Sequence, residues 1–110
     1  MGLVDKIRRA REQQVPAGGF TFTVRRPTDV EMVAIARSGD VTAWLPHVIG
    51  WEGVREIDVI PGGDPHPLEF NAAVRDEWLA DRPDLLGPLV DAMAKAYEAH
   101  AAALGEATKN

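Results

Sequence analysis

The chain contains no cysteine, a single serine (Ser38) and only three histidines, which are His47, His66 and His100. Without cysteine it can form neither disulfides nor thiolate metal sites, which fits a protein of the cytoplasm. No two histidines are four residues apart, and no base is placed near Ser38, so the sequence indicates neither a helical metal pair nor an activated nucleophile. We therefore expect no catalytic residue, no metal ion and no cofactor.

Long apolar runs are also missing. No stretch approaches the ~18 apolar residues that a membrane-spanning helix requires, and the N-terminus lacks an apolar core of signal-peptide length. We expect no association with a membrane. The chain has 110 residues, of which 45% are apolar and 26% are charged, and these values indicate one soluble globular domain with a modest core.

Charge is distributed unevenly along the chain. Residues 1–26 hold six basic and two acidic residues, whereas residues 27–110 hold six basic and fifteen acidic ones. An acidic body disfavours nucleic acid as the main partner, because neutralisation of phosphates supplies most of that affinity. The basic segment lies against this acidic body, in solvent or against an acidic partner.

The order of predicted elements indicates an α+β fold that is mainly α-helical. Residues 3–14 are typical of a basic amphipathic helix, and a Pro-Ala-Gly-Gly sequence ends it. Residues 20–24 alternate apolar side chains with threonine, as a half-buried strand does. We expect this strand to pair with residues 54–60 in a short two-stranded β-ribbon. Residues 1–19 are then a peripheral basic helix and linker, and residues 20–110 are a single compact domain.

Capping residues mark the helices in the rest of the chain. Thr28 and Glu31 form a capping box at the start of one helix, and Gly39 is suited to end it. Three more helices are expected, over residues 40–49, 71–80 and 84–104.

Three tryptophans are the strongest apolar anchors of this short chain. Trp44 and Trp78 lie on apolar helix faces, and we expect both in the core together with Tyr97. Trp51 lies between two glycines at a chain reversal. It is either a buried keystone of the fold or a partly exposed contact for a partner.

Several short motifs follow one another along residues 20–110. They are an Arg-Pro-Thr-Asp turn (26–29), Ile-Gly-Trp-Glu-Gly-Val (49–54), Ile-Asp (57–58), Pro-Gly-Gly (61–63), a Phe-opened helix (70), Asp-Arg-Pro-Asp-Leu (81–85) and Ala-Tyr (96–97). In their order and spacing these motifs resemble the tail assembly chaperone family of long-tailed bacteriophages and prophages. The basic helix near the N-terminus has no counterpart in this resemblance.

The resemblance implies a non-enzymatic assembly factor in the cytoplasm of the host bacterium. Such chaperones bind the long helical tape measure protein, keep its apolar stripes from aggregating and help to recruit the tail tube protein. A chaperone of this kind is expected to be a monomer or a small homo-oligomer when alone. Many of these genes also make a longer product by ribosomal frameshifting near their end, which here corresponds to Lys109 and Asn110.

The predicted partner site combines apolar anchors with an acidic rim. We expect Trp51, Leu86 and Met93 to contact an amphipathic helix of the tape measure protein, because the last helix has more apolar positions than a small domain needs. Glu52 and Glu56 at the rim would then favour basic helices.

Two alternatives remain open at this stage. A permanent phage structural protein, such as a head–tail connector or tail terminator, would form a stable ring instead of acting transiently. A small metal-dependent hydrolase would use Asp64, His66 and Glu69 in the proline-rich loop.

Overall fold

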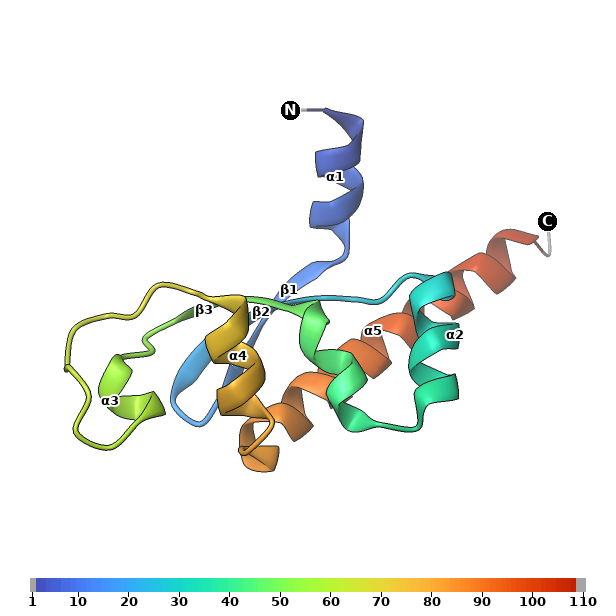
Figure 1. Ribbon diagram of the computed structural model, residues 1–110. Helices are drawn as coiled ribbons and strands as arrows, with labels where there is room; N and C mark the ends of the chain where they lie inside the picture. The colour runs from blue at the N-terminus through green and yellow to red at the C-terminus, as the bar shows by residue number, and fades with distance from the viewer. Residues whose placement is uncertain (1, 109–110) are drawn as a thin grey trace.

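A β-hairpin closed by two glycines begins the sheet on which the fold is built. In the computed structural model, which describes residues 2–108, β1 (Glu12–Ala17) pairs antiparallel with β2 (Phe20–Arg25). Gly18 and Gly19 join them with φ angles of 59° and 85°, and such positive angles suit a two-residue hairpin turn whose twist matches the strands. The third strand, β3 (Val48–Glu52), pairs with the other side of β2 (Figure 1).

Strand β1 corrects the interpretation of the N-terminal region. The helix α1 (Leu3–Ala10) ends before β1, so residues 12–17 are a strand of the sheet and not the end of a helix and a linker. Val15 and Ala17 belong to the core, with 9% and 7% of their surfaces exposed. The compact part of the chain therefore begins before residue 20, because pairing with β2 makes a strand of a segment that has weak strand propensity.

The sheet has three antiparallel strands and not two. The expected pairing of residues 20–25 with residues 54–60 is also wrong. β2 pairs with residues 48–52, which the sequence assigns to a helix end and a connection, and not with residues 54–60. The latter segment contains the short helix α3 (Glu56–Val59). Val54 is buried with 1% exposure, whereas Ile57 is 43% exposed, so these apolar residues do not form the inward row that a strand requires.

Helices cover one face of the sheet, and the other face is more polar. Along β2, Phe22 and Val24 are fully buried, whereas the alternating Thr21 and Thr23 are only partly buried. The covering elements are the 3-10 helix η1 (Val41–His47), α4 (Ala72–Leu79) and α5 (Pro83–Thr108). The fully buried large side chains lie between these layers, and they are Phe22, Val24, Pro27, Val48, Val54, Leu79, Leu85, Leu89 and Met93. The result is a mixed α+β fold that is mainly helical.

The helix-capping interactions predicted from the sequence are present in the structure. The Thr28 hydroxyl accepts a hydrogen bond from the Glu31 amide, and the Glu31 carboxylate accepts one from the Thr28 amide, at the start of α2 (Asp29–Ser38). Gly39 ends this helix in the left-handed conformation, with φ of 63°. Asn71 caps α4 by accepting from the Val74 amide at 3.1 Å.

The expected core residues have different environments. Trp78 is buried with 5% exposure, and Trp44 is half-buried and packs against the core from η1. Tyr97 is half-buried outside the core cluster, where its ring packs against His100. A hydrogen bond with Asp29 of α2 raises the pKa of Tyr97. Tyr97 therefore joins α5 to the start of α2 and is not a core residue.

Helix α1 projects from the body of the protein (Figure 1). None of its residues is buried. Its base is tied to the sheet by a hydrogen bond from the Arg26 amide to the Arg11 carbonyl at 2.8 Å. The molecule measures 58 × 36 × 21 Å along its principal axes. Within residues 2–108, no helix has both the length and the apolar composition to cross a membrane.

Candidate partner-binding surface

Trp51 is a buried member of an aromatic cluster beneath the sheet. It is 9% exposed, and its indole Nε1 donates a hydrogen bond to the Leu68 carbonyl at 2.8 Å. Its ring packs edge-on against Phe70 and Trp78, with centroid distances of 4.8 and 5.7 Å. Of the two roles considered for Trp51, the structure supports the buried keystone.

Leu86 and Met93 are also core residues. They are 3% and 0% exposed, and their neighbours Leu85 and Leu89 on α5 have no exposed surface. Met93 therefore leaves no apolar area free for a partner, and Leu86 leaves only its 3% exposed surface, because the sheet and α4 cover that side of α5. The apolar arc of α5 is wide because it packs against several elements at once.

Glu52 and Glu56 are exposed and lie on two different elements. Glu52 is the last residue of β3, and Glu56 is the first residue of α3. The Glu56 Oε1 atom accepts a hydrogen bond from the Asp64 amide at 3.1 Å, which closes the loop between α3 and α4. The structure therefore gives Glu56 a role in holding this loop.

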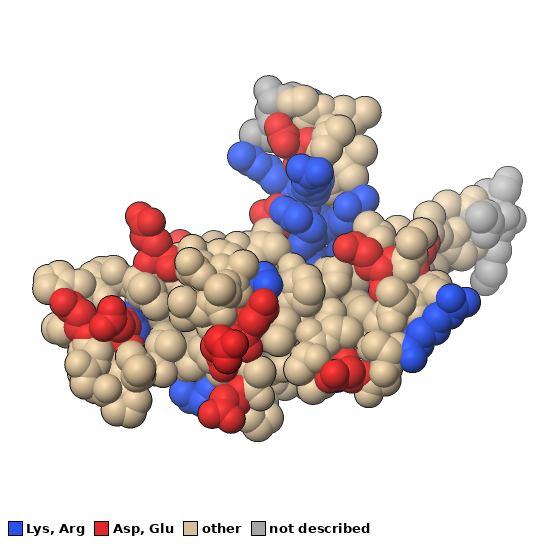
Figure 2. Space-filling view, viewed as in Figure 1, with Lys and Arg blue, Asp and Glu red and all other residues tan. Residues whose placement is uncertain are grey.

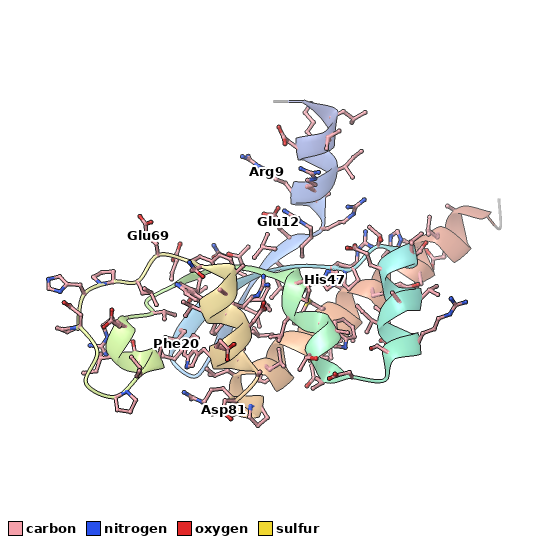
Figure 3. All side chains as sticks on the ribbon, viewed as in Figure 1. Arg9, Glu12, Phe20, His47, Glu69 and Asp81 are labelled. Atoms are coloured by element: carbon pink, nitrogen blue, oxygen red, sulfur yellow. The ribbon has the colours of Figure 1, made fainter. Side chains whose placement is uncertain are left out.

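The proline-rich loop brings together only two of the three candidate metal ligands, Asp64 and His66. The His66 ring contacts the Asp64 carboxylate, and this contact lowers the pKa of Asp64. Glu69 points away from the body (Figure 3). Within the described part of the chain, no three His, Cys, Asp or Glu side chains are grouped to hold a metal ion.

An apolar hollow lies between α2 and η1. It has a volume of about 370 Å³, and its lining residues are Met32, Ile35, Ala36, Gly39, Asp40, Val41 and Trp44. A smaller hollow of about 140 Å³ shares Val41 and is also lined by Thr42, Leu79, Ala80, Pro83, Leu86 and Gly87. We call the two together the η1 groove. Val41 stands between the two hollows and is 54% exposed.

The sequence does contain a signal for this groove, although of the predicted partner-site residues only Leu86 lines it. Met32, Ile35 and Ala36 are spaced to form one face of α2. Ile35 on this face is buried, but Met32 is only half-buried and Ala36 is exposed, because η1 is a short 3-10 helix that contains Pro46. A longer regular helix in the place of η1 would bury more of α2.

The η1 groove is bordered by negative charge. Asp40 lines it, and the hydrogen bond from the Thr42 amide lowers the pKa of Asp40. Glu31 lies one turn before Ile35, and hydrogen bonding with Thr28 lowers its pKa. Both carboxylates are therefore ionised near neutral pH. Figure 2 shows basic side chains gathered on α1, and acidic side chains at many points on the body.

Arg75 is a buried residue that the sequence did not single out. It is 9% exposed, and its Nη1 atom donates to the Val48 carbonyl at 3.0 Å on the outer edge of β3. Its guanidinium also pairs with Asp76 and lies 5.8 Å from the Phe70 ring centroid. Arg75 thereby joins α4 to the sheet edge and protects it from pairing with another strand.

His47 ends η1 beside the groove elements and is buried, with 8% exposure (Figure 3). Burial lowers the pKa of His47 by disfavouring the imidazolium, Glu31 opposes this effect, and Arg25 and Arg75 lower the pKa further. The folded protein therefore resists protonation at His47.

We expect the free energy of unfolding to fall as the pH decreases from about 6.5 towards 5. In this range the unfolded chain takes up a proton on His47 near the ordinary pKa of about 6.5, while the folded chain, in which the pKa of His47 is lower, takes up less. Above this range His47 is neutral in both the folded and the unfolded chain, so it no longer lowers the free energy of unfolding. Urea denaturation should show a weaker pH dependence for His47→Gln than for the parent. Equal pH dependence in His47→Gln and the parent would contradict this assignment.

Comparison of the chain with protein-family models, with curated proteins and with solved structures found no match.

Proposed function

We propose that this chain is a non-enzymatic tail assembly chaperone of a long-tailed phage or prophage, acting in the host cytoplasm. Its proposed partners are the tape measure protein and, during recruitment, the tail tube protein. The observation that carries the proposal is the η1 groove, an apolar hollow with Asp40 in its lining and Glu31 one helical turn before the lining residue Ile35. A groove of this kind suits one apolar face of an amphipathic helix.

The motifs behind the family resemblance have structural roles. Residues 26–29 form the start of α2, and residues 49–54 include most of β3 and the core residues Trp51 and Val54. Residues 81–85 form the turn into α5, where Arg82 Nε donates to Asp84 at 3.0 Å. The motifs behind the resemblance therefore stabilise the fold. The proposed partner contacts are apolar residues outside these motifs, such as those of α2.

The residues proposed to contact the partner differ from those predicted from the sequence. The half-buried Met32 and the exposed Val41 supply apolar surface that the buried Trp51 and Met93 side chains do not, and Leu86 contributes only its 3% exposed surface to the smaller hollow. Basic side chains flanking the apolar stripe of a tape measure helix would face the ionised rim. The chaperone would hold such a stripe out of water until the tail tube subunits replace it.

The test is co-expression with a tape measure fragment encoded by the same phage. The parent chain should keep the fragment soluble, and the double variant Met32→Glu/Val41→Glu should lower the soluble yield about tenfold or more. Placing carboxylates in the apolar hollow imposes a desolvation cost on any helix that covers them, and about 1.4 kcal/mol suffices for a tenfold change.

The matched control is Ile57→Glu/Ile60→Glu, which adds the same charge at two exposed apolar residues of the α3 region, 43% and 57% exposed. This control should keep the fragment as soluble as the parent does. Circular dichroism should show that all three proteins are folded. Equal yields with the groove variant and the control would contradict binding in the η1 groove. A stable ring of the purified parent would instead favour a permanent structural protein.

A further inference from the structure

Helix α1 has an apolar face that no other described residue of its own chain covers. Leu3, Val4 and Ile7 form a stripe at helical spacing, and they are 71%, 59% and 43% exposed. An isolated helix of eight residues is marginal in water, so helical order here calls for a packing partner. Within the chain, α1 projects away from the body (Figure 1).

The η1 groove is matched to α1 in size. An eight-residue helix is about 12 Å long, and α2, the ten-residue wall of the groove, is about 15 Å long. The groove is open and apolar, with Met32 half-buried and Val41 exposed along it and Ile35 buried at its base. It therefore offers a row of apolar contacts to a stripe of three side chains.

The two surfaces also have opposite charge. Residues 3–11 contain four basic residues and one acidic residue, and Arg9 points away from the body (Figure 3). Residues 28–47, which form α2 and η1, contain three acidic residues and one arginine. Attraction between them favours docking of α1 over pairing of α1 with another α1, which would bring like charges together.

We propose that α1 of one copy docks in the η1 groove of a second copy of this chain. The interface is heterologous, because a helix on one copy meets a different surface on the next. When one contact forms, the first copy keeps a free groove and the second keeps a free α1, so association continues head to tail unless a ring closes. This inference concerns the chain alone and does not depend on the proposed function.

The contact is small, so we expect reversible association rather than a permanent complex. Sedimentation velocity over a range of concentrations should show a weight-average mass that rises above that of the monomer as the concentration increases. Ile7→Glu and Val41→Glu should each raise the apparent dissociation constant about tenfold or more. Both side chains are exposed, so the fold should tolerate either change.

Mixing the two variants provides the sharpest test. The Ile7→Glu protein keeps an intact groove, and the Val41→Glu protein keeps an intact α1, so one sound interface forms between them. The mixture should give a heterodimer and nothing larger, while each variant alone stays monomeric. Ile57→Glu, which changes an exposed apolar residue outside both surfaces, should associate as the parent does.

Several results would overturn the proposal. The proposal fails if the parent chain stays monomeric at all concentrations. It also fails if Ile7→Glu and Val41→Glu have the same weight-average mass as the parent at each concentration. If Val41→Glu still self-associates while Ile7→Glu does not, α1 docks somewhere other than the groove. Association that strengthens with added salt would indicate pairing between two α1 helices, because screening relieves their repulsion. Binding to anionic lipid vesicles that Ile7→Glu abolishes, without self-association, would assign α1 to a membrane surface.

The outcomes for the two proposals are distinguishable. Ile7→Glu leaves the groove intact, so it should lose self-association and still keep a tape measure fragment soluble. Loss of both properties in this variant would show that α1 does not act only on a second copy.

Discussion

Replacing Trp78 with alanine should lower the free energy of unfolding by about 3–5 kcal/mol, the range for large core side chains. Trp78 lies at the junction of α4 and the sheet, with 5% of its surface exposed. Its ring centroid is 5.4 Å from Phe20, 6.1 Å from Phe22 and 5.7 Å from Trp51. The substitution therefore removes apolar burial and three aromatic contacts, and it leaves a cavity between layers that cannot easily close.

Urea denaturation with linear extrapolation measures this loss. Trp44→Ala is the matched control, because Trp44 is half-buried at the rim of the η1 groove and packs against the core from one side. It should lose clearly less stability than Trp78→Ala. An equal loss in both variants, or an unchanged midpoint for Trp78→Ala, would place the centre of the core elsewhere.

The second large effect is expected at Gly18 in the β1–β2 turn. Gly18 has φ of 59°, and a Cβ atom placed on it would lie 2.3 Å from Leu85 Cδ2. Leu85 is fully buried on α5, so its side chain has little room to move. Gly18→Ala should therefore cost about 2–4 kcal/mol, which combines left-handed backbone strain of about 1 kcal/mol with overpacking of about 1–3 kcal/mol.

Gly19→Ala separates these two contributions. Gly19 has φ of 85°, but a Cβ atom there would meet nothing within 4 Å, so only the backbone strain remains. The difference between the two variants in denaturation experiments should report the contact with Leu85. If both variants lose the same stability, the hairpin tip does not pack on α5 as the structure shows.

Features that depend on near neighbours in the chain are predictable from the sequence. The capping box of Thr28 and Glu31, the left-handed Gly39 and the Asn71 cap all involve hydrogen bonds or backbone angles within a few residues. The alternation along β2 is likewise a local pattern of side chains. Such interactions favour the same structure whatever the rest of the chain does.

Strand pairing is not predictable in this way. The Glu-Gln-Gln-Val-Pro-Ala segment of β1 has little strand propensity, and the two glycines after it indicate a helix end as readily as a hairpin. The segment becomes a strand because β2 satisfies its backbone groups and covers Val15 and Ala17. Residues 48–52 become a strand for the same reason, and this pairing turns Trp51 inward.

The helix caps, the strand over residues 20–24, the mainly helical α+β class and the uneven charge follow from the sequence alone. Which apolar residues remain exposed is set by the tertiary fold. Trp51, Leu86 and Met93 look like available anchors along the chain, but β3, α4 and the sheet cover them. The less prominent Met32 and Val41 line an open groove, because the short η1 covers α2 incompletely. The exposed area of a side chain depends on contacts with elements that are distant in the sequence, and a local pattern of residues does not specify those contacts.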